Sequence, residues 1–99
     1  MMESSGLQAV ASNGALTIRI TGPMDLLLTT ALRDFCHGTG EVYRRYIVDL
    51  REVSIVRDSG LALLLMLKRL VSRTGATLHV ISSNSELMRR CIRLGISPA

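Results

Sequence analysis

The sequence predicts one small α/β domain, in which a mixed β-sheet of about four strands carries about three helices. Three observations indicate this fold. Apolar and polar residues alternate over Ala15–Thr21, which is typical of a strand with one buried face. Further along the chain, strand-like and helical segments follow one another. A chain of 99 residues also has room for only one hydrophobic core. The expected order of elements is β-β-α-β-α-β-α.

The first two strands are expected to form a hairpin. Leu7–Ala11 is predicted to pair with Ala15–Thr21, because Asn13-Gly14 between them is the dipeptide most typical of a tight hairpin turn. Gly22-Pro23 is expected to end the second strand. Residues 1–6 are polar and are expected to form a flexible N-terminus, so that the domain spans residues 7–99.

The middle of the chain alternates between helix and strand. Asp25 is a suitable N-cap for a helix that runs to about His37. The apolar, β-branched run Tyr46–Leu50 predicts a buried strand, which a short irregular stretch over Arg51–Asp58 follows. Leu61–Val71 is apolar on nearly every side, so it predicts a helix that packs against the sheet and a neighbouring element.

The last strand and helix have clear boundaries in the sequence. Thr77–Ile81 predicts a strand, and Ser83 with Glu86 three residues later predicts a capping box at the start of a helix. Gly95 is a suitable end for that helix. Its apolar side is expected to hold Leu87, Met88, Cys91, Ile92 and Leu94, and its polar side Arg89, Arg90 and Arg93.

The charge of the chain is concentrated in its second half. Residues 51–99 hold seven Arg and one Lys against three acidic residues, whereas residues 1–50 hold four Arg against five acidic residues. Arg rather than Lys favours bidentate contacts with carboxylates or phosphates. Aromatic residues make up only 3% of the chain, which argues against proteins that stack nucleic-acid bases on rings. No direct contact with nucleic acid is expected, because only the charge of Arg89, Arg90 and Arg93 would support one.

Cysteine usage and hydropathy indicate a cytoplasmic protein. Cys36 and Cys91 form no CxxC pair and lie in helical patterns, where a buried thiol acts as a small apolar group in a reducing compartment. The first residues lack the pattern of a secretory signal. The longest apolar run, Leu61–Leu67, is far shorter than the ~20 residues that cross a bilayer, so no membrane insertion is expected.

The sequence carries no signature of an enzyme. It has neither a phosphate-binding GxxxxGK[ST] or GxGxxG loop nor an HExxH or GxSxG motif. His37 and His79 lie in unrelated segments, so neither has an evident partner for acid–base catalysis. Asp49 at the end of a predicted strand either bonds loop amides or faces a site. We therefore predict a non-enzymatic protein with no catalytic residue, metal or cofactor.

The turn Val56–Leu61 is the candidate functional segment. Its polar residues separate two very apolar segments and place Asp58 or Ser59 at the start of a helix. Free amides and the helix dipole stabilise negative charge there. A serine hydroxyl at this point is accessible to a kinase, and a phosphate would add about −1.5 to −2 charges. A simple N-cap is the alternative interpretation, and the residues alone leave both open.

Residues 46–96 carry a resemblance to a known family. They read YIVDLREVSIVRDSGLALLLMLKRLVSRTGATLHVISSNSELMRRCIRLGI, and TIRITGPMD lies upstream. This text resembles the STAS domain family, of the anti-sigma factor antagonist type. Family members share a strand ending in D-L, a D-S-S-G-L or D-S-S-A-L turn, an aliphatic helix, a further strand and a helix ending in L-G-I or L-G-L. The resemblance implies a STAS-like fold over most of the chain.

The resemblance also implies partner switching in transcription regulation. Family antagonists dock on a GHKL-type serine kinase that is also the anti-sigma factor, and a PP2C-like phosphatase reverses the phosphorylation. The implied partner-binding residues here are Val56, Arg57, Asp58, Ser59, Gly60, Leu61 and Asp25. Without a gap, Asp58 occupies the position of the family's phosphorylated serine and supplies a fixed charge. A shift of one residue makes Ser59 the phosphorylation candidate, and both alignments stay open.

The chain also resembles a second functional class, which is the alternative to the first. Short STAS subunits that bind the ATPase of lipid-transport ABC complexes also end soon after the L-G-I segment, and they use a similar turn without phosphorylation. A homodimer is a further expectation left open, because Leu64–Leu67 suits either a core or an interface.

Overall fold

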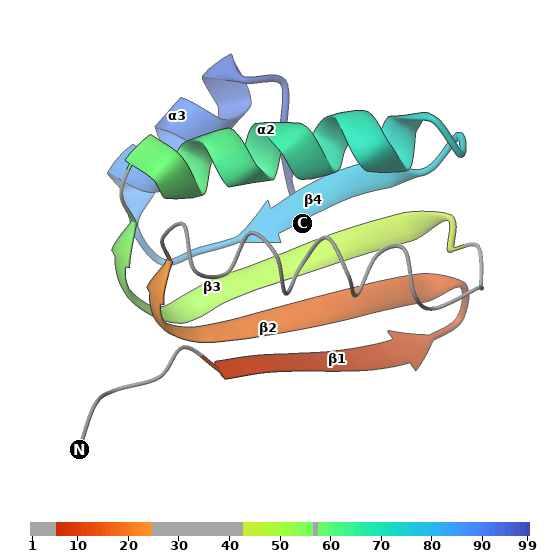
Figure 1. The fold of residues 1–99 in the computed structure, drawn as a ribbon, viewed down its shortest axis with the longest axis horizontal. Helices are drawn as coiled ribbons and strands as arrows, with labels where there is room; N and C mark the ends of the chain where they lie inside the picture. Colours follow the sequence, from red (N-terminus) through yellow and green to blue (C-terminus); the bar gives the residue numbers. More distant parts are fainter. Residues whose placement is uncertain (1–5, 25–42, 57) are drawn as a thin grey trace.

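A five-stranded mixed sheet forms the centre of the fold (Figure 1). The computed structural model describes residues 6–24, 43–56 and 58–99. The strands lie in the order β1-β2-β3-β4-β5, with β1 antiparallel to β2 and all other neighbours parallel. The elements are β1 (Gly6–Ser12), β2 (Ala15–Met24), β3 (Arg45–Val56), α2 (Asp58–Ser72), β4 (Thr77–Ile81), α3 (Ser85–Arg93) and β5 (Ser97–Pro98).

The predicted hairpin between β1 and β2 is confirmed. Asn13 and Gly14 both have positive φ, of 52° and 77°, which is the geometry of a two-residue turn whose twist matches that of the strands. Pairing runs from Gly6 opposite Thr21 to Ser12 opposite Ala15. Gly6 thus already belongs to the first strand, one residue before the predicted start of the domain.

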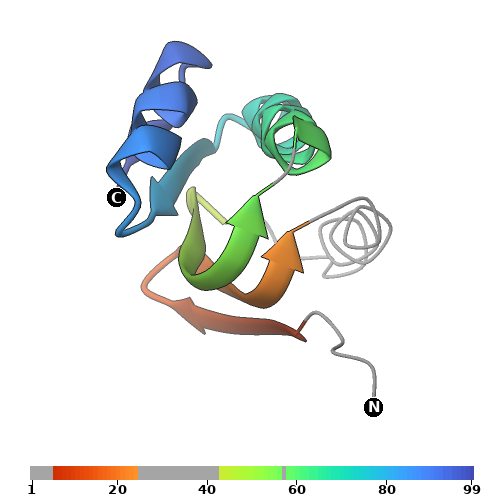
Figure 2. The ribbon, with the colours of Figure 1, turned by 90° about the vertical axis from the view of Figure 1, so that its left-hand side faces the viewer.

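One apolar layer between the sheet and the helices forms the core. Figure 2 shows α2 and α3 on the same side of the sheet, as expected where successive parallel crossovers share a right-handed sense. Alternate residues of β2, β3 and β4 point into this layer, as the periodicity predicts. The buried residues are Leu16, Ile18, Ile20, Tyr46, Val48, Leu50, Leu63, Leu64, Leu67, Val71, Ala76, Leu78, Val80, Leu87, Cys91 and Ile96.

Strand β3 is longer than the sequence predicts. The expected irregular stretch after Leu50 is wrong, because β3 continues to Val56. Its register with β2 shifts by one residue between Arg19 and Thr21, and again between Gly22 and Met24. Each shift inserts an extra residue into β3, which breaks the alternation that marks a strand in a sequence. The predicted end of β2 at Gly22 is wrong for the same reason, since β2 follows β3 to Met24.

Two further differences concern the C-terminal part. A fifth strand, missed because two residues show no alternation, pairs Ser97 with His79 and Pro98 with Val80. Ile92 was expected on the apolar side of the last helix, but its side chain is 56% exposed. In α3 only Leu87 and Cys91, which are four residues apart, are buried.

The helix expected over residues 25–37, with Cys36 and His37, lies outside the described residues.

The C-terminal ends of the two described helices are linked. Lys68 of α2 donates a hydrogen bond from Nζ to the carbonyl oxygen of Leu94, at 3.1 Å. Gly95, the predicted end of α3, has a φ of 80°, a conformation that suits glycine. A Cβ at this position would press against the end of the Lys68 side chain, which would have to shift, so the positive φ is the main reason for glycine here. This contact holds α3 beside α2.

Asp49 is a structural residue of β3. Of the two roles that the sequence left open, the geometry supports bonding to the chain. Its Oδ1 accepts hydrogen bonds from the backbone N–H of Arg51 at 3.1 Å and from Arg51 Nε at 3.0 Å, and Oδ2 accepts one from Nη2 at 2.8 Å. These bonds lower the pKa of Asp49, against the opposing effect of burial. They lie at the first register shift and hold its backbone in place.

The replacement Asp49→Asn is expected to lower the urea midpoint of unfolding at pH 7. The pKa of Asp49 is lower in the folded state than in the unfolded chain, so its carboxylate stabilises the fold above a pH of about 3.9, and this contribution disappears as the pH falls further. The difference between wild type and variant should therefore shrink in acid. Glu86→Gln, which removes an exposed ion pair, is the matched control. A pH-independent difference would contradict this role.

Candidate functional site: the turn between β3 and α2

The turn from β3 into α2 lies at the edge of the sheet and is open to solvent. Val56 ends β3 and Asp58 is the first residue of α2, as the sequence predicted for this acid. The Asp58 side chain is exposed, whereas Gly60 is buried and Val56 and Leu61 are half-buried. The turn thus presents a carboxylate beside partly exposed apolar side chains. Its backbone begins a helix, where negative charge is favoured.

Three of the residues implied by the resemblance are not placed. Asp25 and Arg57 lie outside the described residues. Ser59 is the second residue of α2, and its side chain lies outside the described part of the structure. The residues that the structure brings together at the turn are therefore Val56, Asp58, Gly60 and Leu61.

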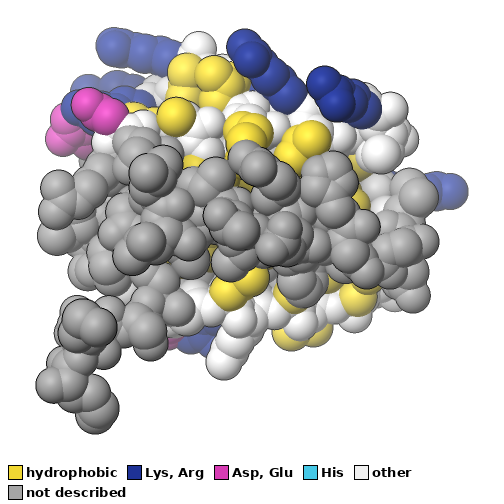
Figure 3. Space-filling model, in the orientation of Figure 1, with side chains coloured by type: hydrophobic (Ala, Val, Ile, Leu, Met, Phe, Trp, Pro, Cys, Tyr) yellow, Lys and Arg dark blue, Asp and Glu magenta, His cyan; other side chains and the backbone are white. Residues whose placement is uncertain are grey.

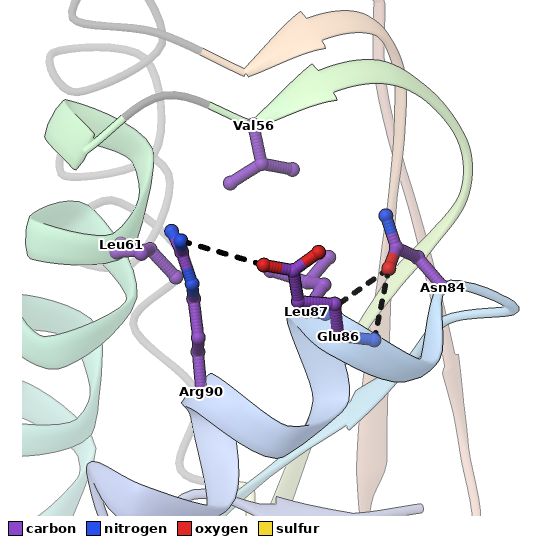
Figure 4. Close-up of a pocket in the computed structure, with 6 residues that line it drawn as sticks. All are labelled: Val56, Leu61, Asn84, Glu86, Leu87 and Arg90. Atoms are coloured by element: carbon purple, nitrogen blue, oxygen red, sulfur yellow. Dashed lines mark hydrogen bonds and ion pairs between the residues drawn. The ribbon is translucent and has the colours of Figure 1, made fainter.

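A second turn, from β4 into α3, lies beside the first. A cavity of about 190 Å³ separates them (Figure 4), a volume comparable with that of one large side chain. It is lined by Val56, Leu61, Asn84, Glu86, Leu87 and Arg90. Three of these lining side chains are apolar and three are polar. This composition suits the insertion of a partner's side chain into the cavity.

The start of α3 forms the polar part of this cavity. Asn84 is the N-cap, and its Oδ1 accepts hydrogen bonds from the N–H groups of Glu86 at 3.0 Å and Leu87 at 3.1 Å. The predicted capping box with Ser83 is therefore wrong by one residue. The cluster Ser82–Glu86 offers several capping side chains, and Asn is as good an N-cap as Ser, so the pattern alone does not choose between them.

The charges at the cavity suit binding better than catalysis. Arg90 Nη2 lies 3.6 Å from Glu86 Oε1, and Figure 4 shows this pair across the mouth of the cavity. Both side chains are exposed, so water screens the pair and a partner could replace it at low cost. Within the described residues, no group of three or more His, Cys, Asp and Glu side chains lies together to hold a metal.

The remaining titratable candidates lie away from the turn. His79 Nε2 is 3.0 Å from Thr77 Oγ1 in β4, and its Nδ1 is excluded from solvent. Cys91 is buried in the core, and burial raises the pKa of its thiol. A thiol with a raised pKa is a poor nucleophile, so Cys91 acts as an apolar core residue.

The contribution of the second turn is not evident from the local sequence pattern. Asn84, Glu86 and Arg90 were interpreted as helix-start or surface residues. A usable signal was present, because two neighbouring parallel strands end at the same edge of a sheet, and the segments that follow them start side by side. The pairing of Asp49 with Ile81 at the end of β4 establishes that arrangement.

Comparisons with known proteins identify the fold. No protein-family model and no curated protein matches the sequence. The structure matches the anti-sigma factor antagonist SpoIIAA in its unphosphorylated form, with a TM-score of 0.72 and 18% identity over 95% of this chain and 87% of that chain. It matches an anti-sigma factor antagonist from Mycobacterium paratuberculosis with a TM-score of 0.75 and 16% identity over 97% and 87%.

A transport-related protein has the same fold. A sulfate transporter family protein from Wolinella succinogenes matches with a TM-score of 0.72 and 20% identity, over 87% of this chain and 70% of that chain. The chain therefore has the α/β fold of these proteins, which is the STAS fold expected from residues 46–96. No helix in the described ranges is long and apolar enough to span a membrane.

Replacing Asn84 by Ala is expected to lower the free energy of unfolding by about 1 kcal/mol, because two N–H groups at the start of α3 lose their acceptor. Ser83→Ala is the matched control and should change it by less than about 0.5 kcal/mol. Urea denaturation followed by circular dichroism measures both values. A larger loss of stability for Ser83→Ala than for Asn84→Ala would instead support Ser83 as the N-cap.

Proposed function

We propose that this chain is a non-enzymatic regulatory binding module of the anti-sigma factor antagonist type. It docks through residues 56–62 on a GHKL-type serine kinase that also acts as the anti-sigma factor. The observation that carries the proposal is the exposed Asp58 at the first position of α2, between half-buried Val56 and Leu61. The STAS fold and the similarity to anti-sigma factor antagonists support it.

Negative charge at the turn is the proposed means of control. Phosphoryl transfer from ATP to the Ser59 hydroxyl would release ADP, and hydrolysis by a PP2C-like phosphatase would release inorganic phosphate and restore the serine. A dianion beside Asp58 would make the local charge about −3. A docked partner would have to desolvate these charged groups. If Ser59 is not phosphorylated, Asp58 alone supplies a permanent, weaker charge at the same place.

A second candidate function is that of a short accessory subunit on the ATPase of a lipid-transport ABC complex. The acidic residue at the start of α2 favours it, because a turn with a permanent charge needs no phosphorylation in order to bind. The similarity to a sulfate transporter family protein is compatible with this class. Co-purification of the tagged chain with either a kinase or an ABC ATPase from its own cells separates the two functions.

We expect Ser59 to be the phosphorylated residue. A GHKL-type serine kinase from the same cells, given ATP, should add one phosphate to the wild type and none to Ser59→Ala, as measured by the mass of the intact protein. Ser85→Ala is the matched control, because Ser85 likewise lies in the first turn of a helix, and it should be labelled fully. Undiminished labelling of Ser59→Ala would exclude Ser59 as the acceptor.

The variant Asp58→Asn tests docking through the turn. It should change the Kd for the same kinase by about fivefold or more, since a charge at an interface affects affinity strongly once water is excluded. Gln8→Lys shifts the net charge by the same amount on exposed β1, and its Kd should stay within about twofold of the wild type. Titration calorimetry measures both. Equal effects of the two variants would exclude the turn as the docking site.

A further inference from the structure

An apolar groove runs between α2 and α3, beside the turn. Its first part has a volume of about 300 Å³ and is lined by Leu61, Ala62, Leu65, Arg90, Arg93 and Leu94. A wider hollow adjoins it at Leu65 and follows α2 alone, lined by Leu65, Lys68, Arg69, Ser72 and Arg73. We call these residues together the α2–α3 groove. From Leu61 to Arg73 the groove is about 18 Å long, at the rise of an α-helix.

The rim of the α2–α3 groove is strongly basic. Lys68, Arg69 and Arg73 line it along α2, and Arg90 and Arg93 line it along α3. Figure 3 shows hydrophobic side chains with Lys and Arg on either side of them along the upper edge of the molecule. Guanidinium groups bind carboxylates in a bidentate way and pack their stems on apolar surface. The groove thus combines an apolar floor with binding groups for carboxylates.

The charge along the groove is also directional. Asp58 precedes Leu61 by three residues and Leu65 by seven, so it shares their face of α2 and lies at the end nearest the turn. Glu86, which faces Arg90, adds a second acid at this end. At the far end, all the charged residues among the described lining are basic, including Arg69 and Arg73. A segment bound here should therefore place its acidic residues away from the turn.

We propose that the α2–α3 groove receives an amphipathic, acidic helix of the protein partner. The apolar stripe of that helix lies on Leu61 and Leu65, and its carboxylates pair with Arg69 and Arg93. Helix-in-groove binding places apolar residues at a spacing of three and four, and a groove of this length accommodates about three turns. The proposal rests on the proposed function and deepens it, because Leu61 lines both the cavity at the turn and the groove.

Other occupants fit the groove less well. A second copy would bring helices that are themselves basic, and the described acids of the sheet, Asp49 and Glu52, already pair with Arg51 and Arg19. A nucleic acid would leave the apolar floor unmatched, since no aromatic side chain is among the described lining residues. An anionic bilayer is flat on this scale and would not fill a concave surface between two helices.

A designed peptide tests the groove directly. The probe is a fluorescein-labelled helix of about 16 residues with Leu at every third and fourth position and Glu beside them, a length at which such a helix forms measurably. The matched peptide carries Lys in place of Glu. Fluorescence anisotropy should show that the acidic peptide binds at least about tenfold more tightly than the basic one. Amide shifts in ¹⁵N spectra should map to Leu61, Leu65 and Arg93.

Two charge reversals on α3 distinguish the groove from overall charge. Arg93→Glu should raise the Kd for the acidic peptide by about tenfold. Arg89 is exposed on the same helix and lies outside the groove, so Arg89→Glu should raise this Kd by less than about threefold. Circular dichroism confirms that both variants are folded. Equal losses, amide shifts confined to other surfaces, or no binding at low salt would overturn the proposal. So would tighter, Arg93-dependent binding of a DNA duplex or of phosphatidylserine vesicles.

The outcomes separate this proposal from the proposed function. If Asp58→Asn changes the Kd for the kinase and Arg93→Glu does not, docking through the turn stands and the groove proposal is wrong. If the acidic peptide binds with the expected dependence on Arg93 and the kinase does not bind at all, the groove remains a site for acidic helices and the kinase assignment is wrong.

Discussion

The parallel pairing of β3 with β4 determines where the candidate site lies. Because both strands run in the same direction, the segments that follow them begin at one edge of the sheet. The first turn brings Asp58 and Leu61 to this edge, and the second brings Asn84, Glu86 and Arg90. Right-handed crossovers then place α2 and α3 side by side on one face, which creates the groove between them. A different order of strands would separate all of these residues.

Different residues maintain the fold and line the proposed binding surface. Aliphatic side chains of β2, β3, β4 and α2 fill the core, and the one buried carboxylate in the described residues, Asp49, is held by Arg51 within its own strand. The charged groups around the turn and the groove are exposed instead, and the Glu86–Arg90 pair is weak enough to exchange partners. Such groups contribute little to folding, so they are free to determine which partner binds and how fast.

The sequence predicted most of the fold and only half of the candidate site. Alternation located β2 and β4, and Asn13-Gly14 located the hairpin, since each of these signals is local. Local patterns failed where tertiary contacts decide, as in the register shifts that extend β3 and in the two-residue β5. The same holds at the site. Asp58 and Leu61 were visible as a polar turn before an apolar helix, but Arg90 and Arg93 read as a solvent-facing stripe. Only the position of α2 beside α3 places those arginines next to an apolar surface.

Hydrogen–deuterium exchange of the chain bound to the proposed kinase partner tests the central claim most directly. The claim is that recognition occurs at the sheet edge where α2 and α3 begin and along the groove between them. Protection on binding should be confined to residues 56–73 and 84–94, with β1 and the open face of the sheet unchanged. Protection centred on β1, or on the exposed surface around Val10, would contradict the claim.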